Sequence, residues 1–261
     1  MEWRDEGVVL GVKKHGESSV IVELLTRAHG RHLGLVRGGR SARFHSLLQP
    51  GNSLQLVWRA RLDEHLGAYA VEPLALRAGR LMGSALALHG LSYLGALIRL
   101  LPERDPHGAL HEALIVVVDH LDAAEVAPAL IARFEARILA ECGFGLDLER
   151  CAASGARDNL VYVSPKSGRA VSAEAGAPWR DKLLPLPSFL RGEEGDAPPA
   201  ADVADAYRTT GYFLERDLFG PRGLPMPDSR RAFLAAADAA RVPSPRDAGR
   251  RWPEGPDEGL R

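Results

Sequence analysis

The feature that most constrains the fold is a row of five short segments, rich in apolar and β-branched residues, in the N-terminal part of the chain. Turn signals close the first four, and Pro73 closes the fifth. One longer connection, 38–51, separates the third from the fourth. Strands in this arrangement predict an OB-fold, a small five-stranded β-barrel. The predicted strands are 7–13, 18–25, 31–37, 53–61 and 66–72.

Charge is unevenly spread along a chain whose totals nearly balance, with 33 Lys+Arg and 34 Asp+Glu. No acidic residue lies between Glu23 and Asp63, where arginines are frequent. Such a basic stretch typically binds an anionic partner, of which nucleic acid is the commonest, and the alternative is a solvated arginine-rich face. The arginines that we predict to contact nucleic acid are Arg27, Arg31, Arg37, Arg40, Arg43 and Arg59.

Two aromatic residues of this region, Phe44 and Trp58, allow two interpretations. Each could offer a face on which a base stacks beside the arginines. A small barrel, however, needs bulky side chains in its interior. We therefore expect both residues to pack in the barrel core.

The remainder of the chain is mainly helical in pattern, with a short hairpin in the middle. The predicted helices are 80–101, 107–121, 127–141 and 200–218, and the hairpin pairs 160–163 with 169–172. The fold class is therefore α+β with several domains. The predicted organisation is an OB-fold domain at 1–76, a helical domain at 77–150, the hairpin at 151–180, a helical segment completing the helical domain at 181–235 and a disordered tail at 236–261.

Motifs typical of enzymes are scarce: the chain has no phosphate-binding loop and no Gly-x-Ser-x-Gly motif. His107 and His111 are spaced as a helical metal-binding pair, and Asp119 follows, which leaves a metal-dependent hydrolase as one hypothesis. The glutamate of the metalloprotease motif is missing, however, because Gly108 follows His107. We favour two exposed helix histidines and a binding protein that is not an enzyme and has no cofactor or metal.

The sequence gives no sign of export or membrane insertion. Its N-terminus is charged, and no apolar run reaches the about 18 residues that span a bilayer. We expect a cytoplasmic protein that does not bind membranes, in which Cys142 and Cys151 are reduced.

Several motifs, in their order and spacing, resemble those of the RecO family of bacterial recombination mediators and DNA-annealing proteins. The resemblance covers 2–233. Its motifs are Gly7-Val-Val-Leu, Leu35-Val-Arg-Gly-Gly-Arg40, Leu48-Gln-Pro50, Arg133-Phe-Glu-Ala-Arg-Ile-Leu139, Cys142-Gly-Phe-Gly-Leu146 and Pro221-Arg-Gly-Leu-Pro-Met-Pro-Asp-Ser-Arg230.

The resemblance implies an OB-fold domain, a helical domain and a zinc-finger-like excursion. It further implies binding of single- and double-stranded DNA, annealing of complementary strands, and assembly with RecR and the single-stranded DNA-binding protein to load RecA, with association with the nucleoid during repair. Arg37, Arg40 and Arg43 match basic positions that the family uses toward DNA.

Arg133 matches a helix position that in this family receives the acidic, apolar C-terminal tail of the single-stranded DNA-binding protein. Such a tail needs a cation beside an apolar groove, which Phe134 and Ile138 could form. The alternative for Arg133 is a surface salt bridge with Glu135 or Glu141.

The zinc-finger-like excursion departs from the family pattern. Zinc-bearing members have two Cys-x-x-Cys pairs, whereas here the first reads Cys151-Ala-Ala-Ser154 and the second falls near Ser172-Ala-Glu-Ala175. Serine and alanine cannot supply a tetrahedral zinc site, so we predict a hairpin without zinc.

A second functional hypothesis is an RNA-binding OB-fold protein of the translation or ribosome-assembly type. The barrel pattern does not separate RNA from DNA, because contacts to the backbone of a single strand serve either.

Overall fold

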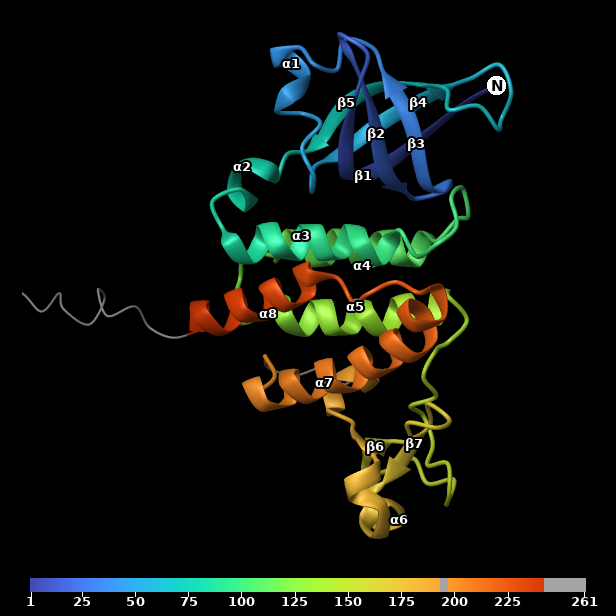
Figure 1. The fold of residues 1–261 in the computed structure, drawn as a ribbon, viewed down its shortest axis with the longest axis vertical. Helices are drawn as coiled ribbons and strands as arrows, with labels where there is room; N and C mark the ends of the chain where they lie inside the picture. Colours follow the sequence, from blue (N-terminus) through green and yellow to red (C-terminus); the bar gives the residue numbers. More distant parts are fainter. Residues whose placement is uncertain (193–196, 242–261) are drawn as a thin grey trace, which may run out of the picture.

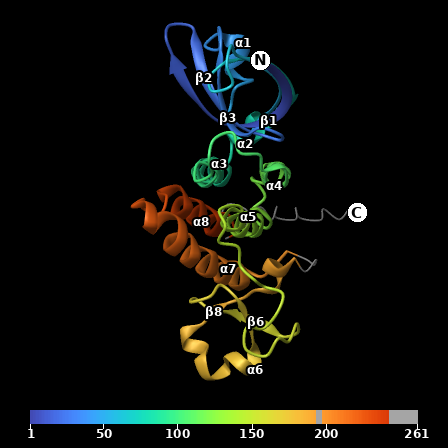
Figure 2. The same ribbon diagram turned by 90° about the vertical axis from the view of Figure 1, so that its right-hand side faces the viewer.

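The computed structural model describes residues 1–192 and 197–241. The molecule is elongated, with a β-barrel at one end, helices in the middle and a small sheet at the other end (Figure 1). Figure 2 shows the same order from the side, with the helices α3 (Ala85–Ile98) and α4 (Gly108–Asp119) lying directly below the barrel. The helical body thus separates the two β structures.

The N-terminal strands close into a barrel in the order β1-β2-β3-β5-β4, which confirms the predicted five-stranded barrel. Closure occurs at a parallel pairing of Leu35 with Ala68. We expected the fifth strand to stop at Pro73, but it continues, with Pro73 opposite Leu54 beside a register shift, where a proline is tolerated. The elements are β1 (Glu2–His15), β2 (Ser19–Thr26), β3 (Gly30–Val36), a short helix α1 (Ala42–His45), β4 (Ser53–Arg59) and β5 (Ala68–Ala75).

The interior of the barrel is filled by the inward-facing side chains of its strands. On β4, Leu54, Leu56 and Trp58 alternate with outward-facing residues and are fully buried. The indole N–H of Trp58 donates to the carbonyl oxygen of Leu66 at 3.0 Å. The predicted core packing of Trp58 is confirmed, and its ring has no face open to a base.

The helical body follows the barrel. The pattern predicted one helix over 80–101, whereas the structure has two, because the Ser84 hydroxyl accepts the Ala87 N–H at 3.2 Å and caps a new helix. The predicted helix 127–141 is confirmed. The elements are α2 (Ala78–Leu81), α3 (Ala85–Ile98), α4 (Gly108–Asp119), α5 (Ala127–Glu141), α7 (Ala200–Phe213), a π-helical segment (Leu214–Phe219), a 3-10 turn (Gly220–Arg222) and α8 (Asp228–Arg241).

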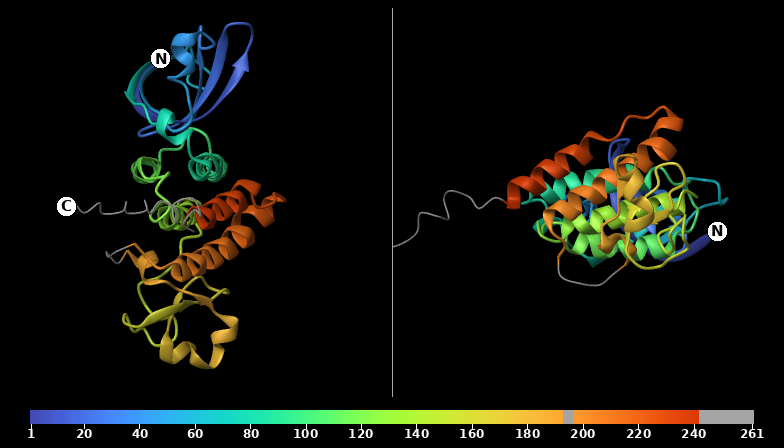
Figure 3. Two further views of the ribbon diagram at one scale, coloured as in Figure 1. Left: turned by 90° about the vertical axis from the view of Figure 1, so that its left-hand side faces the viewer. Right: turned by 90° about the horizontal axis from the view of Figure 1, so that it is seen from below.

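Helix α8 corrects the predicted tail. The disordered tail was expected from residue 236, but 236–241 continue α8, because Phe233 and Ala237 on one face of this helix are buried. Figure 3 shows α8 packed against α3, on the side of α5 that faces away from α4. The rest of the predicted tail, 242–261, lies outside the described residues.

A buried ion pair ties the body together. The Glu135 side chain is fully buried and accepts from Arg230 Nε at 2.8 Å and Arg230 Nη2 at 3.2 Å. The hydroxyl groups of Tyr93 and Thr210 also donate to this carboxylate. Because these residues lie on α3, α5, α7 and α8, one carboxylate links four helices.

The barrel is joined to the body through buried polar contacts. The Asn52 side chain, which is fully buried, accepts the backbone N–H groups of Arg77 and Ala78 at 2.8 and 2.9 Å. Its amide donates to the carbonyl oxygens of Ser46 and Leu47 at 2.9 and 3.0 Å. One side chain therefore connects the α1 loop to the start of α2.

The small sheet contains the predicted hairpin and a third strand. Strand order is β7-β6-β8, and both pairings are antiparallel. The elements are β6 (Leu160–Val163), β7 (Ala170–Ser172), α6 (Ala173–Gly176), a 3-10 helix (Ala177–Lys182), β8 (Leu184–Pro185) and a second 3-10 helix (Ser188–Arg191). Within the described ranges, every helix is too short or too polar to cross a membrane.

Candidate nucleic-acid interface

The six arginines predicted to contact nucleic acid fall into two groups in the structure. Arg27, Arg31 and Arg59 each pair with carboxylates. Their partners and N–O distances are Glu6 at 3.4 Å and Glu112 at 3.1 Å for Arg27, Glu23 at 3.1 Å and Glu103 at 3.4 Å for Arg31, and Glu2 at 2.7 Å for Arg59. A guanidinium that already faces a carboxylate gains less from a phosphate, so these three arginines are less available to an anionic partner.

Arg31 is the least accessible of the paired group, with 13 % of its side chain exposed. It lies where the connection between α3 and α4 crosses the barrel, and its backbone bridges to Glu103 of that connection. The structure thus gives Arg31 a place in the junction between barrel and body.

The other three arginines, Arg37, Arg40 and Arg43, are exposed. Among the described residues, none of the three has a carboxylate within ion-pair distance. Arg40 Nη1 donates to the carbonyl oxygen of Glu17 at 2.6 Å, and the Arg40 backbone N–H donates to Ser18 at 3.0 Å. These neutral partners fix Arg40 beside the β1–β2 turn without cancelling its charge.

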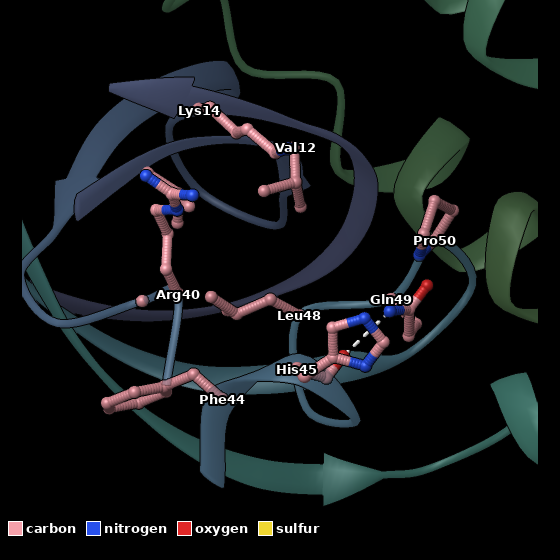
Figure 4. A pocket seen from close by; sticks show the side chains of 10 residues that line it. Val12, Lys14, Arg40, Phe44, His45, Leu48, Gln49 and Pro50 are labelled. Carbon is pink, nitrogen blue, oxygen red and sulfur yellow. Dashed lines mark hydrogen bonds between the residues drawn. The ribbon is translucent and has the colours of Figure 1, made fainter. Parts of the chain in front are cut away.

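A cavity of about 500 Å³, which we call the turn hollow, opens beside these arginines. Figure 4 shows Val12 and Lys14 of β1 on one side, and Arg40, His45 and Leu48 on the side formed by the α1 loop. The full lining is Val12, Lys14, Val20, Gly39, Arg40, Phe44, His45, Leu48, Gln49 and Pro50. The hollow therefore combines a cationic rim with apolar walls.

Lys14 is a candidate that the sequence reasoning missed. It lies before Glu23, outside the stretch without acidic residues. The hairpin pairs Lys14 with Val20, which brings this lysine to the rim that Arg40 also lines. Pairing the first two predicted strands as a hairpin about the His15-Gly16 turn would have indicated this position of Lys14.

Phe44 takes an intermediate position. It packs against the barrel core, as expected, but it is only half-buried and also lines the turn hollow. The Arg43 guanidinium lies over its ring, 5.7 Å from the centroid. Phe44 thus supports the barrel and presents an aromatic surface beside two cations.

A second groove, of about 240 Å³, continues from the turn hollow across Gln49 and Pro50 onto α2 and α3. Its other lining residues are Leu10, Ala78, Leu81, Met82, Leu88, Leu91 and Ser92. Neither lysine nor arginine is among them. The lining of this second groove thus lacks the cations that line the turn hollow.

A third groove, of about 270 Å³, lies between α4 and α5. Arg133 and Phe134, two of the three residues predicted to bind a peptide tail, line it together with Arg137. The third, Ile138, is fully buried and does not line the groove. The other lining residues are Ala113, Val116, Val117 and Leu130.

The contacts of Arg133 differ from the salt bridge considered as its alternative. Its Nε donates to the Phe189 carbonyl oxygen at 3.0 Å. Glu135 is bound to Arg230, and Glu141 accepts from Arg137 Nε at 3.1 Å and lies 2.8 Å from His107 Nδ1. Both carboxylates are thus engaged by other cations.

The histidine pair of the hydrolase hypothesis is buried, so the predicted exposure is wrong. His107 is 8 % exposed and His111 is 1 % exposed, because the N-terminal part of α4 packs against the barrel. Burial lowers the pKa of His111. Asp119, the suggested third ligand, pairs with Arg77. The described part of the chain contains no group of three or more residues arranged to hold a metal ion.

The region matched to the family's zinc finger holds a single thiol. Cys151 is buried, and its Sγ accepts the backbone N–H groups of Ser154 and Ser172 at 3.5 and 3.3 Å. Burial raises the pKa of this thiol, but the hydrogen bonds outweigh burial and lower the pKa to about 6. One thiol beside two serines does not fit a tetrahedral zinc site.

Comparison with known proteins gives two family models that together span most of the chain. The model "Recombination protein O N terminal" matches 1–76, and "Recombination protein O C terminal" matches 83–224. The chain is 62 % identical over 237 residues to a DNA repair protein RecO of Mesorhizobium japonicum, covering 90 % of this chain and 93 % of that protein. It is 60 % identical over 236 residues to one of Methylocella silvestris, covering 90 % and 95 %. It is 55 % identical over 244 residues to one of Rhizobium etli, covering 94 % and 95 %.

Proposed function

The chain belongs to the RecO family of DNA repair proteins, and we propose that it binds single- and double-stranded DNA and anneals complementary strands. In this proposal it also acts with RecR to load RecA onto single-stranded DNA coated by the single-stranded DNA-binding protein. The observation that carries the proposal is the exposed cluster of Arg37, Arg40 and Arg43 on the barrel, whose charges no carboxylate among the described residues cancels.

The proposed mechanism is electrostatic. Arginines that neutralise backbone phosphates attract any strand, because phosphate contacts carry no sequence information. Holding two strands close raises their encounter rate, and base pairing then decides which complexes persist. The mechanism needs neither nucleotide hydrolysis nor a metal, which agrees with a role as a mediator rather than an enzyme.

The test is annealing of two labelled complementary oligonucleotides, one of them coated with the single-stranded DNA-binding protein, without nucleotide or metal. We expect the wild type to accelerate annealing and the Arg37→Ala/Arg43→Ala variant to lose most of this effect. The matched control is Arg27→Ala/Arg59→Ala, which removes the same charge from arginines that already pair with carboxylates. Equal losses in both variants would contradict the assignment of the DNA-binding face.

We propose that the α4–α5 groove binds the C-terminal tail of the single-stranded DNA-binding protein. The groove places Arg133 beside apolar side chains, and Val116 within it is exposed. Val116→Asp should weaken binding of a tail peptide at least tenfold, because the new carboxylate repels the acidic tail and competes with it for Arg133. Leu224→Asp, at an exposed apolar residue outside the groove, is the control.

The RNA-binding hypothesis is tested in the same assay. Matched DNA and RNA oligonucleotides compete for the protein, and we expect DNA to bind at least as well as RNA and only DNA annealing to be accelerated. A clear preference for RNA would favour the second hypothesis. As a mediator of DNA repair, the protein would act in the cytoplasm and associate with the nucleoid during repair.

A further inference from the structure

The turn hollow differs from a plain phosphate-binding surface. A surface that contacts only phosphates needs exposed cations and no depth. Here the rim residues Lys14 and Arg40 stand above apolar walls that include Val12 and Leu48, within a volume of about 500 Å³. This volume is in the usual range for sites that enclose a small molecule.

The walls offer what a nucleobase needs. Every base has an apolar face that packs on aromatic or aliphatic side chains, whatever its identity. Phe44 is half-buried at the hollow, and His45 is exposed beside it. The Gln49 amide donates to the His45 carbonyl oxygen at 2.7 Å, which holds this wall in place, as the dashed line in Figure 4 shows.

We propose that the turn hollow is a subsite for one unpaired nucleotide, with the base against the apolar walls and the phosphate between Lys14 and Arg40. The inference rests on the proposed DNA binding and specifies which form of DNA this part of the barrel takes. A base in a duplex is stacked and paired and cannot enter a pocket unless it is extruded. The subsite therefore favours single strands, whereas Arg37 and Arg43 contact phosphates of either form.

The limits of the cationic surface give the path of the strand. Beyond Pro50 the second groove has no lysine or arginine among its lining residues, so a phosphate finds fewer cations inside that groove than at the turn hollow. On the other side, Arg37 and Arg43 are exposed, and each lies three residues from Arg40 in the loop that lines the hollow. The strand thus leaves the hollow along the loop 37–43 rather than toward α3.

The decisive variant fills the hollow without changing charge. Val12 lines the hollow and is 42 % exposed. It faces outward on its strand, so we expect the fold to tolerate Val12→Phe. We expect the affinity for a single-stranded oligonucleotide of about ten residues to fall roughly tenfold, because one base loses its packing. Affinity for a duplex of the same length should stay within twofold. Leu62→Phe, at an exposed apolar residue of the β4–β5 loop, is the matched control and should change neither.

A second pair of variants tests the aromatic wall. Phe44→Leu should lower single-strand affinity, whereas Phe44→Tyr should keep it, because tyrosine retains the aromatic face. A 2-aminopurine base placed within the oligonucleotide should change its fluorescence on binding to the wild type and not on binding to Val12→Phe.

The outcomes separate this inference from the proposed function. Unchanged single-strand affinity in Val12→Phe, or equal losses for single strand and duplex, would overturn the nucleotide subsite while Arg37→Ala/Arg43→Ala still reports DNA binding. If Val12→Phe instead abolishes binding of an acidic, apolar peptide and spares DNA, the hollow is a peptide site and the inference is wrong. If DNA binding is lost neither in Val12→Phe nor in Arg37→Ala/Arg43→Ala, the proposed function is wrong as well.

Discussion

Glu135 shows how one residue determines the packing of the helical body. A fully buried carboxylate is unfavourable unless its oxygens are satisfied, and here a guanidinium and two hydroxyl groups satisfy them. Arg230 stands in the last of the motifs that resemble the RecO family, and Glu135 stands in the helix motif. The ion pair therefore joins two motifs that lie far apart in the sequence.

Removing this carboxylate should be strongly destabilising. Glu135→Ala leaves the Arg230 charge buried and unpaired, so we expect the free energy of unfolding to fall by about 3–5 kcal/mol. The control is Arg231→Ala, whose salt bridge with Asp228 is exposed and should contribute less than about 1 kcal/mol. Denaturant unfolding measures both. A loss in Glu135→Ala no larger than in the control would show that the pair is not buried.

His32 gives the barrel a pH dependence. It is 2 % exposed, and its Nδ1 lies 2.6 Å from the Tyr69 hydroxyl. Burial, with smaller effects from the charges of Arg104 and His29, lowers the pKa of His32 to about 4. The unfolded chain therefore takes up a proton on this side chain at a higher pH than the folded chain does.

The sign of the effect follows from that difference. The contribution of the buried, neutral His32 to the free energy of unfolding is fully present above about pH 6.5. It is lost as the pH falls toward 4, at up to about 1.4 kcal/mol per pH unit. We expect the free energy of unfolding of His32→Gln to fall less steeply over this range than that of the wild type. His65→Gln, in the exposed β4–β5 loop, should keep the wild-type slope. Parallel slopes for wild type and His32→Gln would refute the burial of a neutral histidine.

At the scale of elements, the positions of the strands were easier to predict from the sequence than the break before α3 and the burial of residues on α4. Alternation and turn signals are local, and they place β2 to β5 to within about three residues, whereas β1 begins at Glu2 rather than at residue 7. The break before α3 depends on Ser84 as a cap within an apolar periodicity that runs through it. The burial of His111 depends on the barrel packing over α4, and no pattern within the helix reports a neighbour that lies elsewhere in the sequence.

The contact between barrel and body includes a glycine that its surroundings require. Gly30 has a φ of +64°, and a Cβ there would lie 1.8 Å from the Asp105 carbonyl oxygen. Gly16 has a φ of +60° with no atom within 4 Å of such a Cβ. The two glycines share the backbone conformation and differ in crowding.

This difference in crowding predicts that Gly16→Ala and Gly30→Ala lower the free energy of unfolding by unequal amounts. Gly16→Ala should cost about 1–2 kcal/mol of unfolding free energy, because only the left-handed conformation is penalised. Gly30→Ala should cost clearly more, since the connection between α3 and α4 must move away from the barrel as well. Thermal or denaturant unfolding of the two variants decides this. Equal losses would mean that the connection moves away easily and does not hold the barrel.

At the scale of the whole molecule, the fold decides which arginines remain available. No acidic residue lies between Glu23 and Asp63, so the sequence alone offered no reason to separate the arginines of this stretch. In the structure, Glu6, Glu103 and Glu112 approach from β1, the α3–α4 connection and α4 and pair with Arg27 and Arg31. Only the three-dimensional arrangement could show that, among the described residues, Arg27, Arg31 and Arg59 are paired with carboxylates while Arg37, Arg40 and Arg43 are not.

The salt dependence of DNA binding should report this difference between the two groups of arginines. Each phosphate contact contributes about 0.9 to the slope of log K against log salt concentration for a duplex. Arg37→Ala/Arg43→Ala should therefore lower the slope by about 2 and weaken binding equally for all sequences. Arg27→Ala/Arg59→Ala should lower it by much less, because those arginines keep their carboxylates in the complex. If both double variants flatten the slope equally, the ion pairs open on binding and the DNA-binding face extends around the barrel.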